Sequence, residues 1–196
     1  MIAFDPSVAL VVVDVQNDFA DPEGSLAVAG GADIIPFVNE HIAEAKAAGA
    51  FVAYTQDWHP PHTPHFVPDG GIWPVHCVMD TWGAVLHPDL VVSGPIVRKG
   101  SEGEDGYSGF TMRAHGSDET VPTALAGLLR EHGVERVVIC GLATDYCVLA
   151  TGLDAVALGF WTSVLVDGVR AVEVTPGDGN RALERLSDAG VTLVGR

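Results

Sequence analysis

Val8-Ala9-Leu10-Val11-Val12-Val13-Asp14-Val15 is a nearly continuous run of apolar, mostly β-branched residues near the start of the chain. Such a run is typical of a strand in a parallel sheet that is buried on both faces. It is too short to span a membrane, and it contains an aspartate. The stretch therefore predicts a buried strand in an α/β fold.

The rest of the chain alternates between strand and helix patterns. Further strands are predicted at 51–55, 90–97, 136–140, 161–166 and 191–194. Helices are predicted at 34–48, at 125–132, at 144–158 with Thr144 as a cap, and from Thr175-Pro176 onward. Gly94-Pro95 indicates that its strand is broken or lies at an edge. This alternation predicts a three-layer α/β/α sandwich with a mostly parallel six-stranded sheet.

Length and charge narrow the class of protein. A chain of 196 residues fits one domain, so residues 1–196 are expected to share one core. The formal charge of −16 argues against binding to nucleic acid, which attracts basic surfaces. Three cysteines cannot all pair, and we expect neither a signal peptide nor a membrane span from this sequence. We expect a reduced, cytoplasmic protein with a small-molecule substrate. No segment supports a homodimer, which stays an open alternative.

Residues 57–88 break the alternation and are rich in His, Pro, Gly and Trp. They contain five histidines and three aspartates, and imidazole and carboxylate are ligands that borderline divalent metals prefer. Loops of this length in compact domains are usually functional or disordered, and the tryptophans here argue against disorder. The segment therefore predicts a metal-binding loop, with zinc, iron or manganese as the ion. Its candidate ligands are Asp57, His59, His65 and His76.

The remaining histidines are interpreted as surface or turn residues. His62 lies between two candidate ligands and is expected to be the spare surface residue of that group. The others have no obvious partner in the sequence: His41, His87, His115 and His132.

Polar side chains follow several of the predicted strands. Ligands bind open parallel sheets beyond the carboxyl ends of the strands, so these ends are expected to meet. Asp14 follows the first strand and Lys99 follows the strand at 90–97, although a lysine in such a place is more often solvated. Cys147 lies near the start of the helix after 136–140, where a helix N-terminus or a nearby ammonium would lower its thiol pKa. The three residues could serve as base, cation and nucleophile.

The other two cysteines are interpreted as buried core residues. Cys140 lies inside a predicted strand, and Cys77 merely follows His76. Other enzyme motifs are absent: the chain has no phosphate-binding glycine pattern and no His-Glu-x-x-His helix.

Six segments resemble the nicotinamidase/pyrazinamidase branch of the isochorismatase-like cysteine hydrolases, and together they span nearly the whole chain. The segments are residues 11–19, the Asp57–His65 stretch, residues 73–78, residues 98–100, residues 107–110 and residues 141–148. The order of all six makes the resemblance specific.

The resemblance implies an isochorismatase-like hydrolase fold and a role for each matched residue. Asp14, Lys99 and Cys147 match the family's catalytic triad, and residues 57, 59, 65 and 76 match its metal ligands. The backbone amides of Ala143 and Cys147 match an oxyanion hole beside a cis peptide bond at Leu142–Ala143. Aromatic walls for a pyridine ring match Phe19 and Trp73, with Tyr107 lining the pocket. The implied activity is hydrolysis of nicotinamide, and also of pyrazinamide, in NAD salvage.

Two alternatives remain open. One is an amidohydrolase of the same superfamily that acts on another small amide, such as an N-carbamoyl compound, without a metal to orient a ring. The other is a binding or scaffold protein that keeps the fold without activity. The intact triad residues argue against the second alternative.

Overall fold

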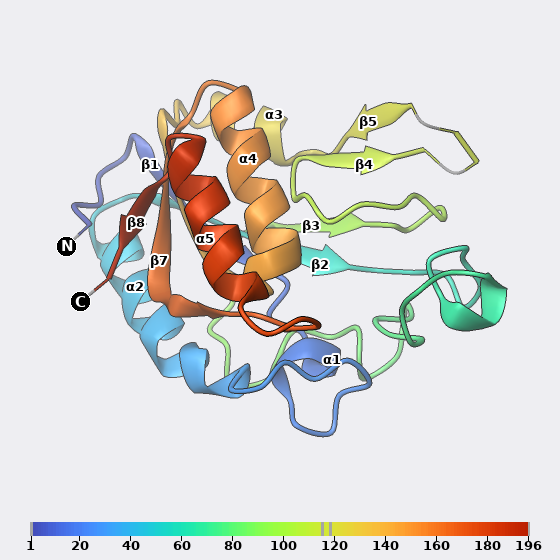
Figure 1. Cartoon of the computed structure of the whole chain (residues 1–196). Helices are drawn as coiled ribbons and strands as arrows, with labels where there is room; N and C mark the ends of the chain where they lie inside the picture. Colours follow the sequence, from blue (N-terminus) through green and yellow to red (C-terminus); the bar gives the residue numbers. More distant parts are fainter. Residues whose placement is uncertain (1, 115, 118, 196) are drawn as a thin grey trace.

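The computed structural model describes residues 2–114, 116–117 and 119–195. A six-stranded sheet runs through its centre in the order β3-β2-β1-β6-β7-β8 (Figure 1). Every neighbouring pair in this sheet is parallel. The strands are β1 (Val8–Val13), β2 (Phe51–Asp57), β3 (Ile96–Lys99), β6 (Arg136–Leu142), β7 (Trp161–Arg170) and β8 (Thr192–Val194).

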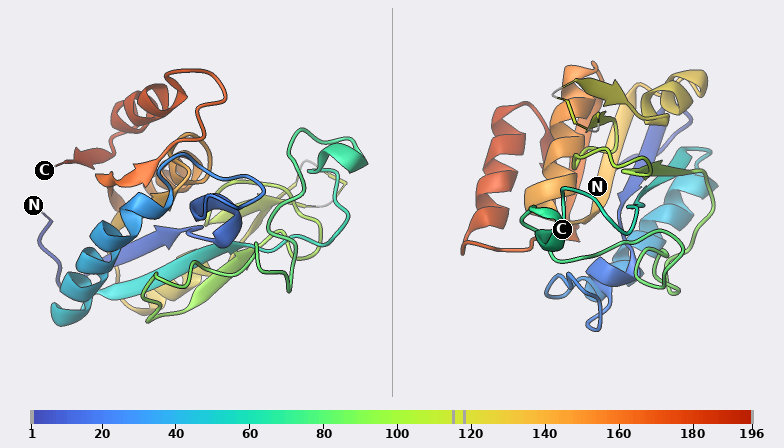
Figure 2. Two further views of the ribbon diagram at one scale, coloured as in Figure 1. Left: turned by 90° about the horizontal axis from the view of Figure 1, so that it is seen from below. Right: turned by 90° about the vertical axis from the view of Figure 1, so that its right-hand side faces the viewer.

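Helices cover both faces of this sheet, which confirms the predicted three-layer sandwich (Figure 2). Alternate residues of β1 point to opposite faces, as the twofold period of a strand requires. Leu10 and Val12 join one core, to which α2 (Ile35–Ala47) contributes apolar side chains. Val11 and Val13 join the other core, which is covered by α3 (Leu125–Glu131), α4 (Leu149–Ala157) and α5 (Asp178–Asp188).

The strand predicted at 90–97 is shorter and lies later, at Ile96–Lys99. Gly94 explains the difference, because a Cβ atom there would lie 1.9 Å from the carbonyl oxygen of Val52. The chain thus passes too close to β2 at this point for a regular strand, and Pro95 offers no N–H for pairing. Pairing with β2 begins at Ile96 and reaches Lys99, which lies opposite Asp57.

Two predicted helix starts are also wrong. The helix expected from Thr144 opens as a five-residue π-helical turn, η3 (Thr144–Val148), before α4, and Ala143 stands at the N-cap without a side-chain hydrogen bond. The last helix begins at Asp178 instead of Thr175-Pro176, with Gly177 at its N-cap in the left-handed conformation. The carboxylate of Glu173 accepts from the backbone N–H of Gly179, 2.9 Å away, and holds this start.

Small elements outside the main sheet were not predicted. A two-stranded antiparallel sheet joins β4 (Thr111–Arg113) to β5 (Thr120–Pro122). Short helical turns form α1 (Asn17–Ala20), η1 (Ala32–Ile34) and η2 (Val67–Asp69). Each spans only three or four residues, which is too short for a hydrophobic period to be read from the sequence.

The segment at 57–88 contains little regular structure, as predicted, but it is fixed by side chains from the end of β1. The amide of Gln16 donates to the carbonyl oxygens of Asp57 and Ala84 at 2.7 and 2.8 Å. The carboxylate of Asp18 accepts from the backbone N–H of Cys77 at 2.6 Å. These buried contacts place the loop against the carboxyl edge of the sheet.

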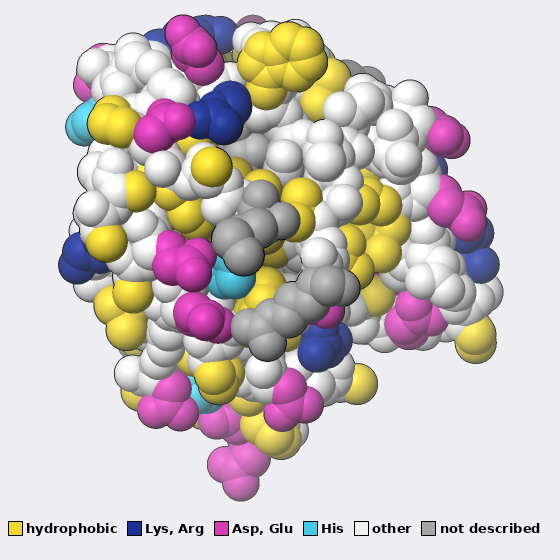
Figure 3. Space-filling view, turned by 90° about the vertical axis from the view of Figure 1, so that its left-hand side faces the viewer, with side chains coloured by type: hydrophobic (Ala, Val, Ile, Leu, Met, Phe, Trp, Pro, Cys, Tyr) yellow, Lys and Arg dark blue, Asp and Glu magenta, His cyan; other side chains and the backbone are white. Residues whose placement is uncertain are grey.

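The surface carries many acidic side chains, as expected from the acidic composition. Figure 3, which looks onto the side that carries both chain ends, shows acidic side chains spread among apolar ones. Within the described ranges, no helix is long and apolar enough to cross a lipid bilayer.

Candidate active site

The carboxyl edge of the sheet brings Asp14, Lys99 and Cys147 together, as the strand ends predicted. Asp14 follows β1, Lys99 ends β3, and Cys147 lies in η3 just beyond β6. Asp57 ends β2, between the strands that carry the other groups. Because the strands are parallel and adjacent, their last residues share one side of the sheet.

Lys99 is the centre of this group. Its Nζ atom lies 2.8 Å from Oδ2 of Asp14, forms a second ion pair with Asp57, and lies 3.6 Å from Sγ of Cys147. The side chain is only 1% exposed, so the expectation that such a lysine is usually solvated is wrong here. Burial opposes the charge, but the two carboxylates outweigh it and raise the pKa of Lys99 well above its ordinary value. The lysine is therefore a fixed cation.

The two carboxylates beside Lys99 differ. Burial raises the pKa of Asp14, although the Lys99 charge opposes this, and Thr55 donates a hydrogen bond to the carboxylate at 2.6 Å. Burial would also raise the pKa of Asp57, but the charges of Lys99 and His59 hold that pKa well below its usual range. Asp14 is therefore the carboxylate that can more readily take up a proton.

The thiol of Cys147 does not have the lowered pKa that the sequence predicted. Burial raises the pKa of its thiol well above the usual value, and Asp14 and Asp57 add to this rise while Lys99 opposes it. The net pKa of the thiol is therefore raised and not lowered as predicted, although the Lys99 ammonium does lower it. The Asp14 carboxylate and the Cys147 sulfur lie within 4.8 Å of each other, and the negative charge of Asp14 favours the protonated sulfur. The resting pair is therefore a thiol beside a carboxylate.

Three histidines of the loop meet beside these groups. His59, His65 and His76 are buried, and one ring nitrogen from each lies within 4.8 Å of the others. Asp57 approaches the same cluster, since its Oδ2 lies 3.7 Å from Nε2 of His59. All four predicted ligands are therefore neighbours.

The hydrogen bonds of these rings suit a metal ion. Nδ1 of His76 lies 2.7 Å from the carbonyl oxygen of Pro74, and Nδ1 of His65 lies 2.9 Å from Oδ1 of Asp105. Both contacts use Nδ1 and leave Nε2 free to bind a metal ion, which is the usual arrangement of metal-binding histidines. Within the described chain both ring nitrogens of His59 are buried without a hydrogen-bond partner, so a cation would satisfy a group that is otherwise left unpaired. Burial lowers the pKa of His76 to about 4, which keeps it in the neutral form that binds metals.

The other histidines lie outside the cluster. The side chain of His62 is 85% exposed and lies 3.4 Å from Asp69, as expected for the spare residue. His41 and His132 contact carbonyl oxygens of their own helices. His87 is buried and lies 3.9 Å from Asp21, so its interpretation as a surface residue is wrong. His115 lies outside the described residues.

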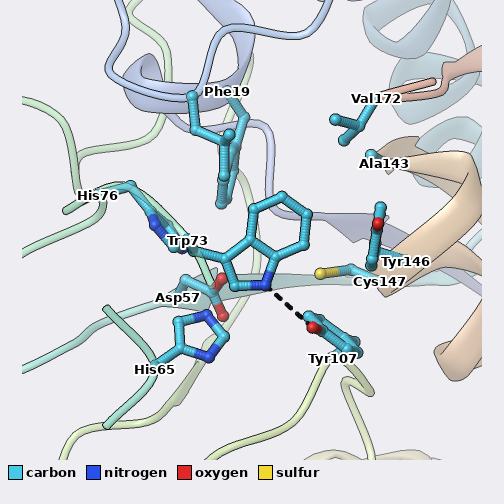
Figure 4. Close-up of a pocket in the computed structure, with 11 residues that line it drawn as sticks. Phe19, Asp57, His65, Trp73, His76, Tyr107, Ala143, Tyr146, Cys147 and Val172 are labelled. Atoms are coloured by element: carbon cyan, nitrogen blue, oxygen red, sulfur yellow. Dashed lines mark hydrogen bonds between the residues drawn. The ribbon is translucent and has the colours of Figure 1, made fainter. Parts of the chain in front are cut away.

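A pocket of about 360 Å³, counting the part open to solvent, joins the thiol to the histidines. Phe19, Trp73 and Tyr107 all line it, as the resemblance implied (Figure 4). Nε1 of Trp73 donates to the hydroxyl of Tyr107 at 3.0 Å, and this bond fixes the indole. The pocket thus presents flat apolar walls with polar groups at one end, which suits a small aromatic amide.

Three further residues of the site were not predicted from the sequence. Leu26, Tyr146 and Val172 also line the pocket. Leu26 and Val172 come from irregular segments, where no pattern in the sequence marks them. Tyr146 is adjacent to Cys147 and could have been found from that position alone. Ala143 lines the pocket as well, and the peptide bond between Leu142 and Ala143 is cis, at the position that the resemblance implied.

Comparisons with known proteins agree with this geometry. The isochorismatase domain family matches residues 8–196. The nicotinamidase/pyrazinamidase of Mycobacterium tuberculosis is 43% identical over 194 residues, which cover 95% of this chain and 97% of that protein.

Two solved structures are similar throughout. A pyrazinamidase of Pyrococcus horikoshii in complex with zinc has a TM-score of 0.86 at 44% identity, covering 97% of this chain and 100% of that one. The PnC1 protein of L. infantum in complex with nicotinate has a TM-score of 0.89 at 36% identity, covering 99% of this chain and 96% of that one. With a family match over nearly its whole length and relatives of this similarity, the chain belongs to the isochorismatase family.

Proposed function

We propose that this protein hydrolyses nicotinamide to nicotinic acid and ammonia, and accepts pyrazinamide as well, in the salvage of NAD precursors. The observation that carries the proposal is the pocket in which the thiol of Cys147 and the histidine cluster occupy one aromatic-walled space. A thiol alone fits any small amide, whereas the added cluster favours a substrate with a ring nitrogen. Relatives named for this activity support the same substrate class.

Asp14 and Cys147 supply the covalent chemistry in this proposal. The Asp14 carboxylate accepts the thiol proton as Sγ attacks the carboxamide carbon, so the thiolate forms only when substrate is in place. Lys99 stays protonated 3.6 Å from Sγ and stabilises the negative sulfur. This assignment agrees with a raised thiol pKa, because the resting sulfur carries its proton.

The carbonyl oxygen gains negative charge during this attack. The backbone N–H groups of Ala143 and Cys147 are the proposed donors to it, and one such donor typically contributes about 3–4 kcal/mol. Asp14 then gives its proton to the departing nitrogen, and ammonia leaves a thioester on Cys147. Asp14 next takes a proton from a water molecule, whose oxygen attacks the thioester carbon. The C–S bond then breaks, and Asp14 returns the proton to the departing sulfur. The products are nicotinic acid and the restored thiol.

The proposed metal ligands are Asp57, His59, His65 and His76, which hold one divalent ion. When bound there, such an ion would supply a Lewis acid for the ring nitrogen of the substrate. The donor set suits zinc, iron or manganese, and the zinc complex of a relative favours zinc. Phe19, Trp73 and Tyr107 hold the two faces of the ring. The segment at 57–88 is then the metal-binding loop of a single-domain enzyme.

The competing activity is hydrolysis of another small amide, such as an N-carbamoyl compound. It uses the same Asp14, Lys99 and Cys147, but it gives the histidine cluster no task. The ring nitrogens of His59 are buried without a hydrogen-bond partner among the described residues, and this favours the nicotinamide proposal.

The test is an ammonia-release assay on the purified protein with nicotinamide, pyrazinamide, benzamide and an N-carbamoyl amino acid. Benzamide is a matched control, because it has the shape of nicotinamide without the ring nitrogen. The assay is run as purified, after chelation, and after zinc, iron(II) or manganese is restored. We expect nicotinamide turnover that chelation abolishes and one metal restores, with benzamide turned over far more slowly.

Other results would reject the proposal. Faster release from the N-carbamoyl compound than from nicotinamide would support the competing activity. Equal rates with benzamide and nicotinamide would show that the ring nitrogen is not recognised. Ammonia release that persists after complete removal of the metal would show that the reaction does not need the histidine cluster.

A further inference from the structure

His65 differs from the other two clustered histidines in what orients its ring. The ring of His76 contacts a backbone carbonyl two residues away, at Pro74, and the ring of His59 has no hydrogen-bond partner within the described chain. The Nδ1 atom of His65 instead lies 2.9 Å from Oδ1 of Asp105, a residue 40 positions further along the chain. His65 is therefore oriented by a side chain that belongs to another segment.

Two interactions with Arg113 hold Asp105 in place, one through its side chain and one through its backbone. Its other carboxylate oxygen forms an ion pair with the guanidinium group of Arg113, the last residue of β4. The two residues also form an antiparallel backbone bridge, in which the N–H of Asp105 donates to the carbonyl of Arg113 at 3.0 Å. The carboxylate therefore has a fixed direction, with one oxygen toward Arg113 and the other toward His65.

The same segment also covers His59. Gly100 has a φ of +83°, and a Cβ atom there would lie 2.6 Å from Nδ1 of His59. The backbone at 100 thus lies directly against one ring, and the carboxylate at 105 lies against another. Figure 4 shows His65 beside Asp57 in the pocket, and both side chains are buried. Gly100 and Asp105 thus cover two of the three clustered rings.

Metal-binding histidines commonly donate their second ring N–H to a carboxylate, which fixes the tautomer and raises the basicity of the ligating nitrogen. We propose that Asp105, held by Arg113, is a positioning residue of the metal site: it accepts the Nδ1–H of His65 and so presents Nε2 as the ligand. The inference rests on the proposed metal site and adds to it a residue that touches neither metal nor substrate.

The experiment measures Zn²⁺ affinity in the purified full chain by competition with a chromogenic chelator. Asp105→Ala removes the acceptor, and Asp105→Asn keeps an oxygen that can accept the same N–H. We expect about 10- to 100-fold weaker Zn²⁺ binding for Asp105→Ala, and a smaller loss for Asp105→Asn. Arg113→Ala should weaken binding in the same direction by less, since the backbone bridge still holds Asp105.

Asp69→Asn is the matched control. It removes one carboxylate charge beside His62 in the same loop, 3.4 Å from a histidine that stands outside the cluster. Its Zn²⁺ affinity should equal that of the wild type. The rise in melting temperature on adding Zn²⁺ is a second readout, and it should shrink for Asp105→Ala alone.

The outcomes separate this inference from the proposed function. A wild-type chain that binds no Zn²⁺, iron(II) or manganese overturns both. Wild-type binding with unchanged affinity in a folded Asp105→Ala variant overturns the inference and leaves the proposed function standing. An equal loss in Asp69→Asn, or an Asp105→Asn variant as weak as Asp105→Ala, also overturns it, because net charge or loop damage would then explain the effect.

Discussion

The ammonium group of Lys99 lies 3.6 Å from the sulfur of Cys147, deep in the protein and between two carboxylates. The sulfur therefore faces one positive and two negative groups, and burial disfavours its ionised form as well. The balance keeps the thiol protonated at rest and makes Asp14 the group that must remove its proton. This relationship leads to the following expectations.

Replacement of Cys147 by alanine should abolish the reaction. Loss of a catalytic nucleophile typically costs several orders of magnitude, so kcat for ammonia release should fall by about 10⁴-fold or more. Cys140→Ala is the control, since that cysteine is buried in the core away from the pocket. It should keep wild-type kcat. Near-normal turnover by Cys147→Ala would contradict the proposed covalent route.

Replacement of Lys99 by methionine should damage both stability and activity. The change leaves Asp14 and Asp57 buried without their cation, and removal of one partner from a buried ion pair typically costs about 3–5 kcal/mol. The free energy of unfolding from urea titration of the metal-free protein measures this cost. Lys46→Met is the control, because the chain's other lysine is exposed and should tolerate the change. Similar unfolding free energies for the two variants would count against the buried network.

Replacement of Tyr107 by phenylalanine should weaken substrate binding without stopping the chemistry. Trp73 loses its acceptor at 3.0 Å, and an unsatisfied donor of this kind costs about 1 kcal/mol, so KM for nicotinamide should rise about 5-fold. Steady-state kinetics would show kcat nearly unchanged. Tyr54→Phe also removes a hydroxyl hydrogen bond, to the carbonyl of Val91, but far from the pocket, and it should leave KM as it is. A selective fall in kcat for Tyr107→Phe would give this tyrosine a different role.

The pH profile should carry an acid limb from Asp14. Its pKa is raised from the ordinary value of 3.8, chiefly by burial, so kcat/KM should fall as pH drops through a midpoint above 3.8. The sign follows because a protonated carboxyl group cannot accept the thiol proton. The measurement is kcat/KM against pH at saturating metal, which limits the contribution of histidine protonation. An activity that stays constant down to pH 3.8 would exclude Asp14 as the base.

Thiol labelling offers an independent check of the same ionisation. Cys147 lines the pocket, whereas Cys77 and Cys140 are fully buried, so iodoacetamide should modify Cys147 first. Because the thiol pKa is raised well above 9.0, the labelling rate should still be rising at pH 9. Mass spectrometry after timed quenching measures both effects. A labelling rate that levels off near neutral pH would indicate a thiolate at rest.

The sequence predicted those parts of the fold that depend on repeating local patterns. The apolar run at Val8–Val13 is a buried strand, and the polar residues that follow the strands meet at one edge of the sheet. The predicted bounds 90–97 were wrong because the close approach of Gly94 to Val52 decides where the strand starts. That contact exists only in the folded chain, so the sequence does not show it.

The parts of the site that the sequence did not predict depend on burial and on distant partners. The pKa of Cys147 follows from the whole environment of the sulfur, so its position near a helix start was misleading. Asp105 contacts His65 from 40 residues further along the chain, and Arg113 pairs with Asp105 at the same place. Neither the environment of the Cys147 sulfur nor the contact between Asp105 and His65 produces a repeating pattern in the sequence.

Lys99 ends β3, which lies at the edge of the sheet and pairs with β2 over four residues only (Figure 1). Short edge strands open locally at a lower free energy than the whole domain. Such an opening withdraws the ammonium group from Asp14 and Cys147 while β1, β6 and β7 remain paired. Enzymatic inactivation in denaturant should therefore precede the loss of circular dichroism, and added metal should narrow the gap because Asp57 is the residue opposite Lys99. The conditions under which this enzyme is active would then be limited by one edge strand, β3, and not by the stability of its core.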